Sequence, residues 1–173
     1  MSKPRMKGLI QFVTVLAFIL TAGCVPKSRN LLRNASFEHA SSRGEPIEWR
    51  FYAYDGGTGS ATVENGALKL QNTSARGRIG VYQRVRVWRD TPYQLSVRIK
   101  ADSGIPIFQV VERVPGVNYR KELDHYLQRG YTGGWKTFRF RLKTTPKTRA
   151  LQIVLGLRNK GTAWFDDIQL VCL

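Results

Sequence analysis

Several runs along the chain alternate apolar and polar residues with a period of two. Between Tyr93 and Ile99, apolar side chains occupy every second position and polar side chains lie between them. The same alternation recurs in the runs 49–53, 68–70, 83–87, 138–142 and 151–157. Turn-favouring residues separate the runs, among them Asn65-Gly66, Asp90-Thr91-Pro92, Gly133-Gly134 and Asn159-Lys160-Gly161. Strands divided by turns about every ten residues predict an all-β sandwich of two antiparallel sheets, each with one face in the core.

One long segment, residues 115–134, does not follow this alternation. Within it, Tyr119, Leu123, Tyr126 and Leu127 have a spacing closer to that of a helix. A connection of this length is uncommon in a compact domain unless it has a function or some structure of its own. We therefore expect either a short helix or a long ordered loop here.

The first residues have the layout of an export signal. Lys3, Arg5 and Lys7 give a positively charged start, and the following run 9–20 contains only two polar residues. A membrane-spanning helix would need roughly 20 apolar residues, so this run is too short to be one. A charged start, a short apolar run and small residues before a cleavage point together predict a secretory signal peptide.

The small residues Ala22 and Gly23 directly precede Cys24, and this arrangement resembles the lipobox of bacterial lipoproteins. In that signal the cysteine thiol receives a diacylglycerol, and cleavage leaves the lipidated cysteine as the first mature residue. Thr21 is a departure from the pattern, because leucine is commoner there. The resemblance implies a signal peptide over residues 1–23, a lipidated tether over 24–29 and a folded domain over 30–173. An ordinary signal peptide followed by an incidental cysteine is the alternative.

The lipid would hold the domain at a membrane of the cell envelope. Val25 follows the cysteine where aspartate would favour retention at the inner membrane, so by analogy with enterobacterial sorting the outer membrane is favoured, if the cell has one. The second cysteine, Cys172, lies in the apolar C-terminal sequence and is interpreted as a small buried residue, with an intermolecular disulfide as the alternative. Neither cysteine has zinc-type or redox spacing.

The positive charge of the chain indicates which kind of partner it binds. The chain has 28 basic and 12 acidic residues, a formal net charge of +16. Removing the three basic residues of the signal leaves 25 basic against 12 acidic residues, a net charge of +13. The basic residues are spread along the chain, so the charge belongs to folded surfaces and attracts polyanions. Export makes nucleic acid a poor partner, which leaves anionic lipid headgroups, acidic polysaccharide or phosphorylated cell-wall polymer.

Two stretches at the ends of the domain carry a family resemblance. Residues 30–38 read NLLRNASFE and are followed by Pro46 and Trp49, while residues 161–170 read GTAWFDDIQL. With the intervening stretches 93–101 and 134–138, this order resembles the carbohydrate-binding modules of families 4, 9, 16 and 22. The resemblance implies a galactose-binding-like jelly roll over essentially the whole domain. Ala35 and His39-Ala40 replace glycines that are usual in the family, and no hydrolase accompanies the module in this chain.

Acidic residues in both end stretches indicate a possible metal. The first strand of a jelly roll begins beside the last, so Glu38 could meet Asp166 and Asp167, and like charges held together need a cation or hydrogen-bond donors. Calcium, a hard cation that takes oxygen ligands, would neutralise them, and the resemblance implies a structural calcium near these positions. The alternative is that the two aspartates cap turns and accept backbone N–H groups.

Sugar recognition requires aromatic rings that stack on sugar faces and polar groups that bond hydroxyls. Alternation and the family motifs place Trp49, Trp135, Phe138 and Phe165 in the core. The resemblance puts the ligand on a concave sheet and its rim. The candidate carbohydrate-binding residues there are Tyr52, Tyr54, Tyr82, Arg84, Arg98, Gln109, Glu112 and Tyr119.

The sequence thus predicts a membrane-anchored, non-catalytic module that binds an acidic or phosphorylated polysaccharide. A structural envelope protein that binds protein partners or forms an oligomer, with no sugar site, is an alternative. A second alternative is a polysaccharide hydrolase or lyase. Its carboxylates would come from Glu112, Glu122 and Asp124, and its other groups from Arg120, His125, Tyr126 and Arg129. No nucleophile motif or phosphate-binding glycine loop supports an enzyme.

Overall fold

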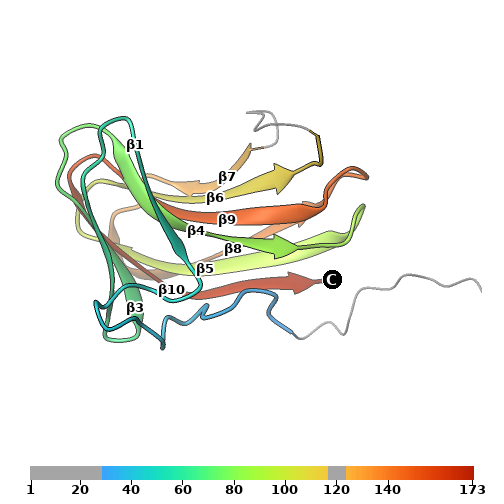
Figure 1. Ribbon diagram of the computed structural model, residues 1–173, viewed down its shortest axis with the longest axis horizontal. Helices are drawn as coiled ribbons and strands as arrows, with labels where there is room; N and C mark the ends of the chain where they lie inside the picture. The colour runs from blue at the N-terminus through green and yellow to red at the C-terminus, as the bar shows by residue number, and fades with distance from the viewer. Residues whose placement is uncertain (1–28, 117–123) are drawn as a thin grey trace, which may run out of the picture.

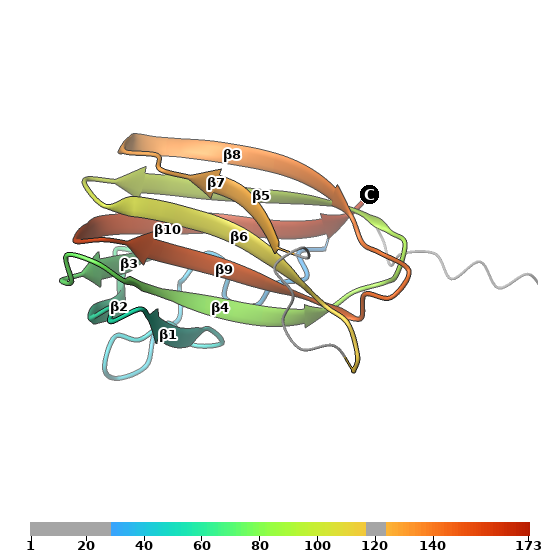
Figure 2. The same ribbon diagram turned by 90° about the horizontal axis from the view of Figure 1, so that it is seen from above.

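The protein is a sandwich of two five-stranded antiparallel sheets (Figures 1 and 2). The structure, a computed structural model, describes residues 29–116 and 124–173, with the side chains of residues 124–127 outside the description. The strands are β1 (Arg50–Tyr54), β2 (Gly59–Glu64), β3 (Ala67–Asn72), β4 (Arg78–Arg86), β5 (Pro92–Ala101), β6 (Ile105–Arg113), β7 (Asp124–Arg129), β8 (Gly133–Lys143), β9 (Ala150–Arg158) and β10 (Gly161–Cys172). The predicted all-β sandwich is confirmed.

The strand order mixes segments that are far apart in sequence. The first sheet has the order β1-β4-β9-β6-β7, and the second sheet has the order β2-β3-β10-β5-β8. The N-terminal segment lies along the last strand: the amide of Leu31 donates to the carbonyl of Leu170 at 2.9 Å, and Asn30 exchanges hydrogen bonds with Ile168 and Leu170. The two ends of the domain therefore meet, as the end motifs predicted.

Period-two alternation explains the core between the sheets. Ile79 and Val81 in the first sheet, like Leu95 and Val97 in the second, are fully buried between the sheets, and the residue between each pair lies on the opposite face of its strand. Each buried aliphatic side chain contributes roughly 1.5–3 kcal/mol through its removal from water. Cys172 is buried as expected, at 5% exposure, but it is disulfide-bonded, which the interpretation as a small buried residue did not include.

The aromatic residues of the end motifs close the core beside β10. Phe37 is fully buried and packs on Trp49 with a ring separation of 5.4 Å. Phe165 is also buried, and Phe138 is partly buried against the core. The prediction that Trp135 belongs to the core is wrong, because its side chain is 40% exposed. It lies an odd number of residues before Phe138 on β8, so the pleat turns it to the opposite face.

The segment that lacked alternation contains a strand where a helix or loop was expected. β7 pairs antiparallel with β6, for example Gln109 with Tyr126 and Ile107 with Arg129. Pairing with the open edge of β6 outweighs the helix-like spacing, since strand preference depends strongly on tertiary context. Residues 117–123 lie outside the described residues. In the parts that are described, no helix has the length and apolar character required to cross a membrane.

Candidate functional site

The outward face of the first sheet carries an open groove of about 470 Å³. Strand register brings its lining together: Tyr82 of β4 is paired with Val154 of β9, which in turn is paired with Gln109 of β6. Paired residues point to the same face of a sheet. The groove is lined by Phe51, Tyr52, Tyr54, Arg78, Tyr82, Arg84, Gln109, Val111, Arg113, Gln152 and Val154.

Three tyrosines form one wall of the groove. The ring of Tyr52 lies 6.3 Å from that of Tyr54 and 6.4 Å from that of Tyr82. Arg78 lies over both Tyr52 and Tyr54, at 5.7 and 5.6 Å from the ring centroids, and Arg84 lies 5.6 Å from the ring of Tyr82. Tyr54 is 60% exposed, so it offers a ring face to a ligand. Cation–π contacts of this kind hold the rings and the guanidinium groups in fixed relative positions.

Two glycines make room for the central tyrosine. Gly80 and Gly156 are register partners on β4 and β9. A Cβ atom at either position would lie 2.7 Å from the hydroxyl oxygen of Tyr52, which is too close for any real side chain. The absence of two side chains therefore lets the Tyr52 ring lie against the sheet, which lowers the floor of the groove.

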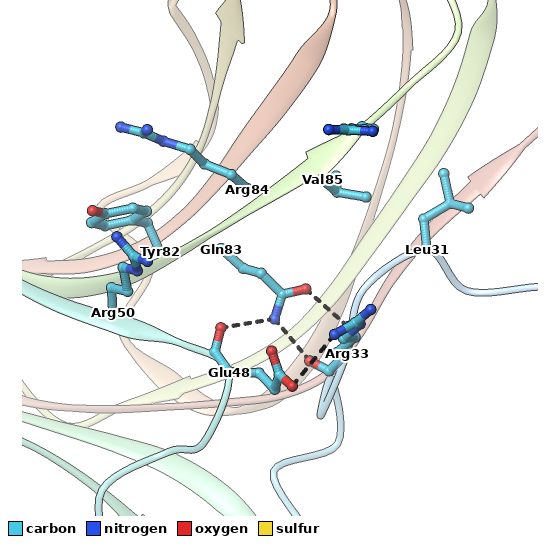
Figure 3. A pocket seen from close by; sticks show the side chains of 9 residues that line it. Leu31, Arg33, Glu48, Arg50, Tyr82, Gln83, Arg84 and Val85 are labelled. Carbon is cyan, nitrogen blue, oxygen red and sulfur yellow. Dashed lines mark hydrogen bonds and ion pairs between the residues drawn. The ribbon is translucent and has the colours of Figure 1, made fainter.

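The groove continues into a second hollow of about 590 Å³, shown in Figure 3. We call it the arginine pocket. It lies beyond the first residue of β1 and shares Tyr82 and Arg84 with the groove. Its lining residues are Leu31, Arg33, Glu48, Arg50, Tyr82, Gln83, Arg84, Val85 and Arg86.

A buried glutamine holds one wall of the arginine pocket. Gln83 accepts from the amide of Arg33 at 2.9 Å and donates to the carbonyls of Arg33 and Glu48 at 2.9 and 3.3 Å (Figure 3). The Arg33 guanidinium lies 3.7 Å from the Glu48 carboxylate, an ion pair exposed at the rim. The side chain of Gln83 thus joins the N-terminal segment to the sheet and fixes the shape of the pocket.

Comparison with known proteins identifies the fold. No protein-family model matches the sequence, and no curated protein matches it. Among solved structures, a family 4 carbohydrate-binding module superimposes with a TM-score of 0.64 and 20% identity, over 82% of this chain and 99% of that one. The family 61 module TmCBM61, solved with β-1,4-galactotriose, superimposes with a TM-score of 0.56 and 21% identity, over 84% of this chain and 100% of that one. This chain has the fold of a non-catalytic carbohydrate-binding module.

The same fold also occurs inside a larger enzyme. The enzymatically active domain of tailspike protein 4 from bacteriophage CBA120 superimposes with a TM-score of 0.65 and 11% identity, over 83% of this chain and 21% of that one. The matched part is therefore a minor portion of that protein. Similarity at these identities shows the fold alone, so the ligand of this module has to be argued from its own surface.

Five of the eight sequence-derived sugar candidates line the groove: Tyr52, Tyr54, Tyr82, Arg84 and Gln109. Three other candidates do not. Tyr119 lies outside the described residues. Arg98 belongs to β5 in the second sheet, on the far side of the module, where its guanidinium stacks 4.7 Å from the Trp135 ring.

Glu112 is the third exception, because it faces inward with Phe108 and Val110 and is only 4% exposed. Its carboxylate accepts from the hydroxyl of Thr148 and from the amide of Thr145, which closes the loop between β8 and β9. The residue is therefore a structural part of the module and cannot reach a sugar in the groove.

The acidic residues of the two end motifs do approach each other in the module. Burial raises the pKa of Asp166; the negative charges of Asp167 and Glu38 raise it further, while the Asp167 amide and Arg98 oppose the change. Arg98 lies 3.5 Å from Asp166 and 3.7 Å from Asp167. Its guanidinium is thus a positive charge beside both aspartates.

The same acidic side chains are the possible ligands of a metal ion. Within residues 29–116 and 124–173, no group of three or more His, Cys, Asp or Glu side chains is placed to hold a metal ion. The side chains as arranged here do not fit a calcium site, and calcium at Glu38, Asp166 and Asp167 stays a prediction of the sequence.

The carboxylates and bases considered for catalysis do not come together in a described site. Arg120 and Glu122 lie outside the described residues, as do the side chains of Asp124, His125 and Tyr126. Arg129 is described and exposed at the end of β7. Glu112 is buried in the structural role given above, so it is not placed for chemistry on a sugar.

Proposed function

We propose that this chain is a membrane-tethered, non-catalytic module of the cell envelope that binds an acidic or phosphorylated polysaccharide along the groove. The observation that carries the proposal is the wall of three tyrosines, Tyr52, Tyr54 and Tyr82, set among arginines on an open sheet face. Aromatic faces and a few oriented polar groups are what a sugar chain needs for binding. An open groove, in contrast to a closed cavity, suits a polymer that extends past both ends.

The charge of this face favours an anionic glycan. In the described residues, the strand register directs seven arginines to the outward face of the first sheet: Arg50, Arg78, Arg84, Arg86, Arg113, Arg129 and Arg158. Guanidinium groups bond carboxylate and phosphate oxygens in planar pairs. A neutral polysaccharide offers guanidinium groups no opposite charge, so a uronic-acid, sulfated or phosphorylated polymer fits better.

A structural neighbour binds a neutral sugar. TmCBM61 was solved with β-1,4-galactotriose. That ligand is neutral, whereas the arginines on the groove face of this chain favour a charged one. We therefore propose that this module binds a charged polymer with a shared fold.

A glycan array at low salt tests the proposal. We expect signals on acidic or phosphorylated polysaccharides that decline as salt rises, because screening weakens attraction between exposed charges. Tyr54→Ala should weaken binding about tenfold, since aromatic anchors dominate many binding energies. The matched control is Trp135→Ala, another exposed aromatic residue, on the opposite sheet. An array without signal at low salt would contradict the proposal and favour a structural protein, whose oligomeric state light scattering would measure.

The tether is a second part of the proposal and rests on the sequence around Cys24. Residues 24–29 can span at most about 20 Å between the lipid and the first described hydrogen bonds, at Asn30 and Leu31. The module would therefore sit close to the membrane surface. Metabolic labelling with a lipid analogue should mark the parent chain and not Cys24→Ser, and an unlabelled parent would contradict the tether.

A further inference from the structure

The arginine pocket holds more positive charge than its own acidic residue can balance. Arg50, Arg84 and Arg86 line it, and none of the three forms an ion pair with an acidic side chain in the described parts of the chain. Glu48, the acidic residue of the lining, is paired with Arg33 on the other wall. Among the described residues, the three guanidinium groups therefore have no acidic partner.

The sheet itself sets the spacing of these groups. Tyr82, Arg84 and Arg86 alternate along β4 and so face the same side, and Arg50 is the register partner of Tyr82 on β1. In Figure 3, Tyr82 lies between Arg50 and Arg84, with Arg33 and Glu48 on the opposite side of the hollow. The pocket thus has a cationic wall around an aromatic ring.

The walls are held before any ligand arrives. Arg84 is fixed from two sides, by its contact with the Tyr82 ring and by the hydrogen bond from its Nε to Gln152 at 2.9 Å. Gln83 fixes the opposite wall through its three bonds to the backbones of Arg33 and Glu48. A preformed site loses less conformational entropy when a ligand binds. A bound oxyanion would supply the opposite charge for the guanidinium groups of the lining.

We propose that the arginine pocket binds an oxyanion substituent carried by the glycan, a carboxylate, sulfate or phosphate group, while the neighbouring sugars lie along the tyrosines of the groove. The inference rests on the proposed function, because Tyr82 and Arg84 line both hollows. A sugar stacked at Tyr82 would place its charged group within reach of Arg50 and Arg86. The pocket would then select charged over neutral polymers.

The experiment uses the purified full chain in detergent and two matched polymer pairs. Polygalacturonate is compared with its methyl-esterified form, and dextran sulfate with dextran, so that each pair differs in charge on one backbone. The pocket variant is Arg50→Gln with Arg86→Gln. The control is Arg139→Gln with Arg141→Gln, two exposed arginines of β8 in the second sheet that remove the same net charge.

We expect the pocket variant to weaken binding of a charged polymer at least about tenfold, since hydrogen bonds to charged groups are among the stronger ones. The control should weaken it less than about threefold. Arg50→Lys with Arg86→Lys keeps the charge but lacks the planar guanidinium fork, so its loss of affinity should lie between those of the pocket variant and the control. Unfolding temperatures of all variants show that they are folded.

Equal losses in the pocket variant and the control would overturn the inference, because net charge alone would then explain binding. Stabilisation by inorganic phosphate without binding of either charged polymer would also overturn it, since the ligand would be a free anion. Binding that Tyr54→Ala weakens and the pocket variant does not change would overturn the proposal for the pocket and support the groove as the binding site. Binding that the pocket variant weakens and Tyr54→Ala does not change would support the anion site in the pocket and contradict sugar binding along the groove.

Discussion

The guanidinium groups of Arg84 and Arg113 donate to the same acceptor, Oε1 of Gln152, at 2.9 and 2.7 Å. The two arginines belong to β4 and β6, and Gln152 lies on β9 between them. One neutral amide oxygen therefore holds two cations in place across three strands. Because an amide does not cancel charge, this hydrogen bond leaves Arg84 able to attract an anion in the groove.

Gln152→Glu should introduce a carboxylate that competes with an anionic ligand for the two arginines. The new carboxylate would accept from both arginines and neutralise part of their charge, as charge-assisted hydrogen bonds are roughly twice as strong as neutral ones. We expect affinity for an acidic polysaccharide to fall about tenfold while the unfolding temperature stays equal or rises. The control is Gln71→Glu, an exposed residue of β3 in the second sheet. Affinity unchanged by Gln152→Glu, measured by titration calorimetry, would show that these arginines do not contact the ligand.

Gly156→Ala tests the floor of the groove. Its Cβ would meet the Tyr52 hydroxyl oxygen at 2.7 Å, whereas its other neighbours, the Ile79 carbonyl oxygen and the Ile107 Cβ, lie at 3.4 and 3.6 Å. The tyrosine ring must therefore move, and the rest of the site can stay. We expect weaker glycan binding with a loss of unfolding free energy of about 1 kcal/mol or less. Gly134→Ala is the control, because a Cβ there has no atom within 4 Å; equal binding by both variants would argue against Tyr52 as a ligand contact.

Glu112→Gln separates a structural carboxylate from a functional one. The buried carboxylate accepts from Thr145 and Thr148, so its replacement should reduce the unfolding free energy by about 1–3 kcal/mol. Glycan binding at a temperature where the variant is folded should not change. Denaturant titration and the glycan assay measure the two effects separately. Release of sugar products by the parent that is lost in Glu112→Gln would instead support the hydrolase or lyase alternative.

Sequence parity predicted part of the site because a strand has only two faces. Tyr52 and Tyr54 were correctly assigned to the face opposite the core, and Tyr82 and Arg84 likewise lie on one outward row. The same alternation excludes Glu112 from the outward face, since it lies an odd number of residues from Gln109 on the same strand. The error came from treating a short stretch of sequence as one surface.

Parity does not say which sheet a strand joins or which strand lies beside it. Arg98 does point outward, but β5 belongs to the second sheet. Gln152 and Arg113 were missed for the same reason, because only the order β4-β9-β6 brings them to Arg84. The signal that could have been used is the pair Gly80 and Gly156: glycine is unusual inside a strand and marks close approach of another group.

Arg98→Ala tests the ion pairs that Arg98 forms with the two aspartates of the expected calcium site. The guanidinium lies within 4 Å of Asp166 and Asp167, so its loss leaves two like charges beside each other. The groups are partly exposed, and we expect a loss of up to about 1 kcal/mol of unfolding free energy that shrinks as salt rises. Arg139→Ala, from the adjacent strand β8, is the control. A loss independent of salt would contradict an electrostatic role. Calcium titration of both proteins tests the sequence prediction, because an ion held by the two aspartates should raise the unfolding temperature of Arg98→Ala more than that of the parent.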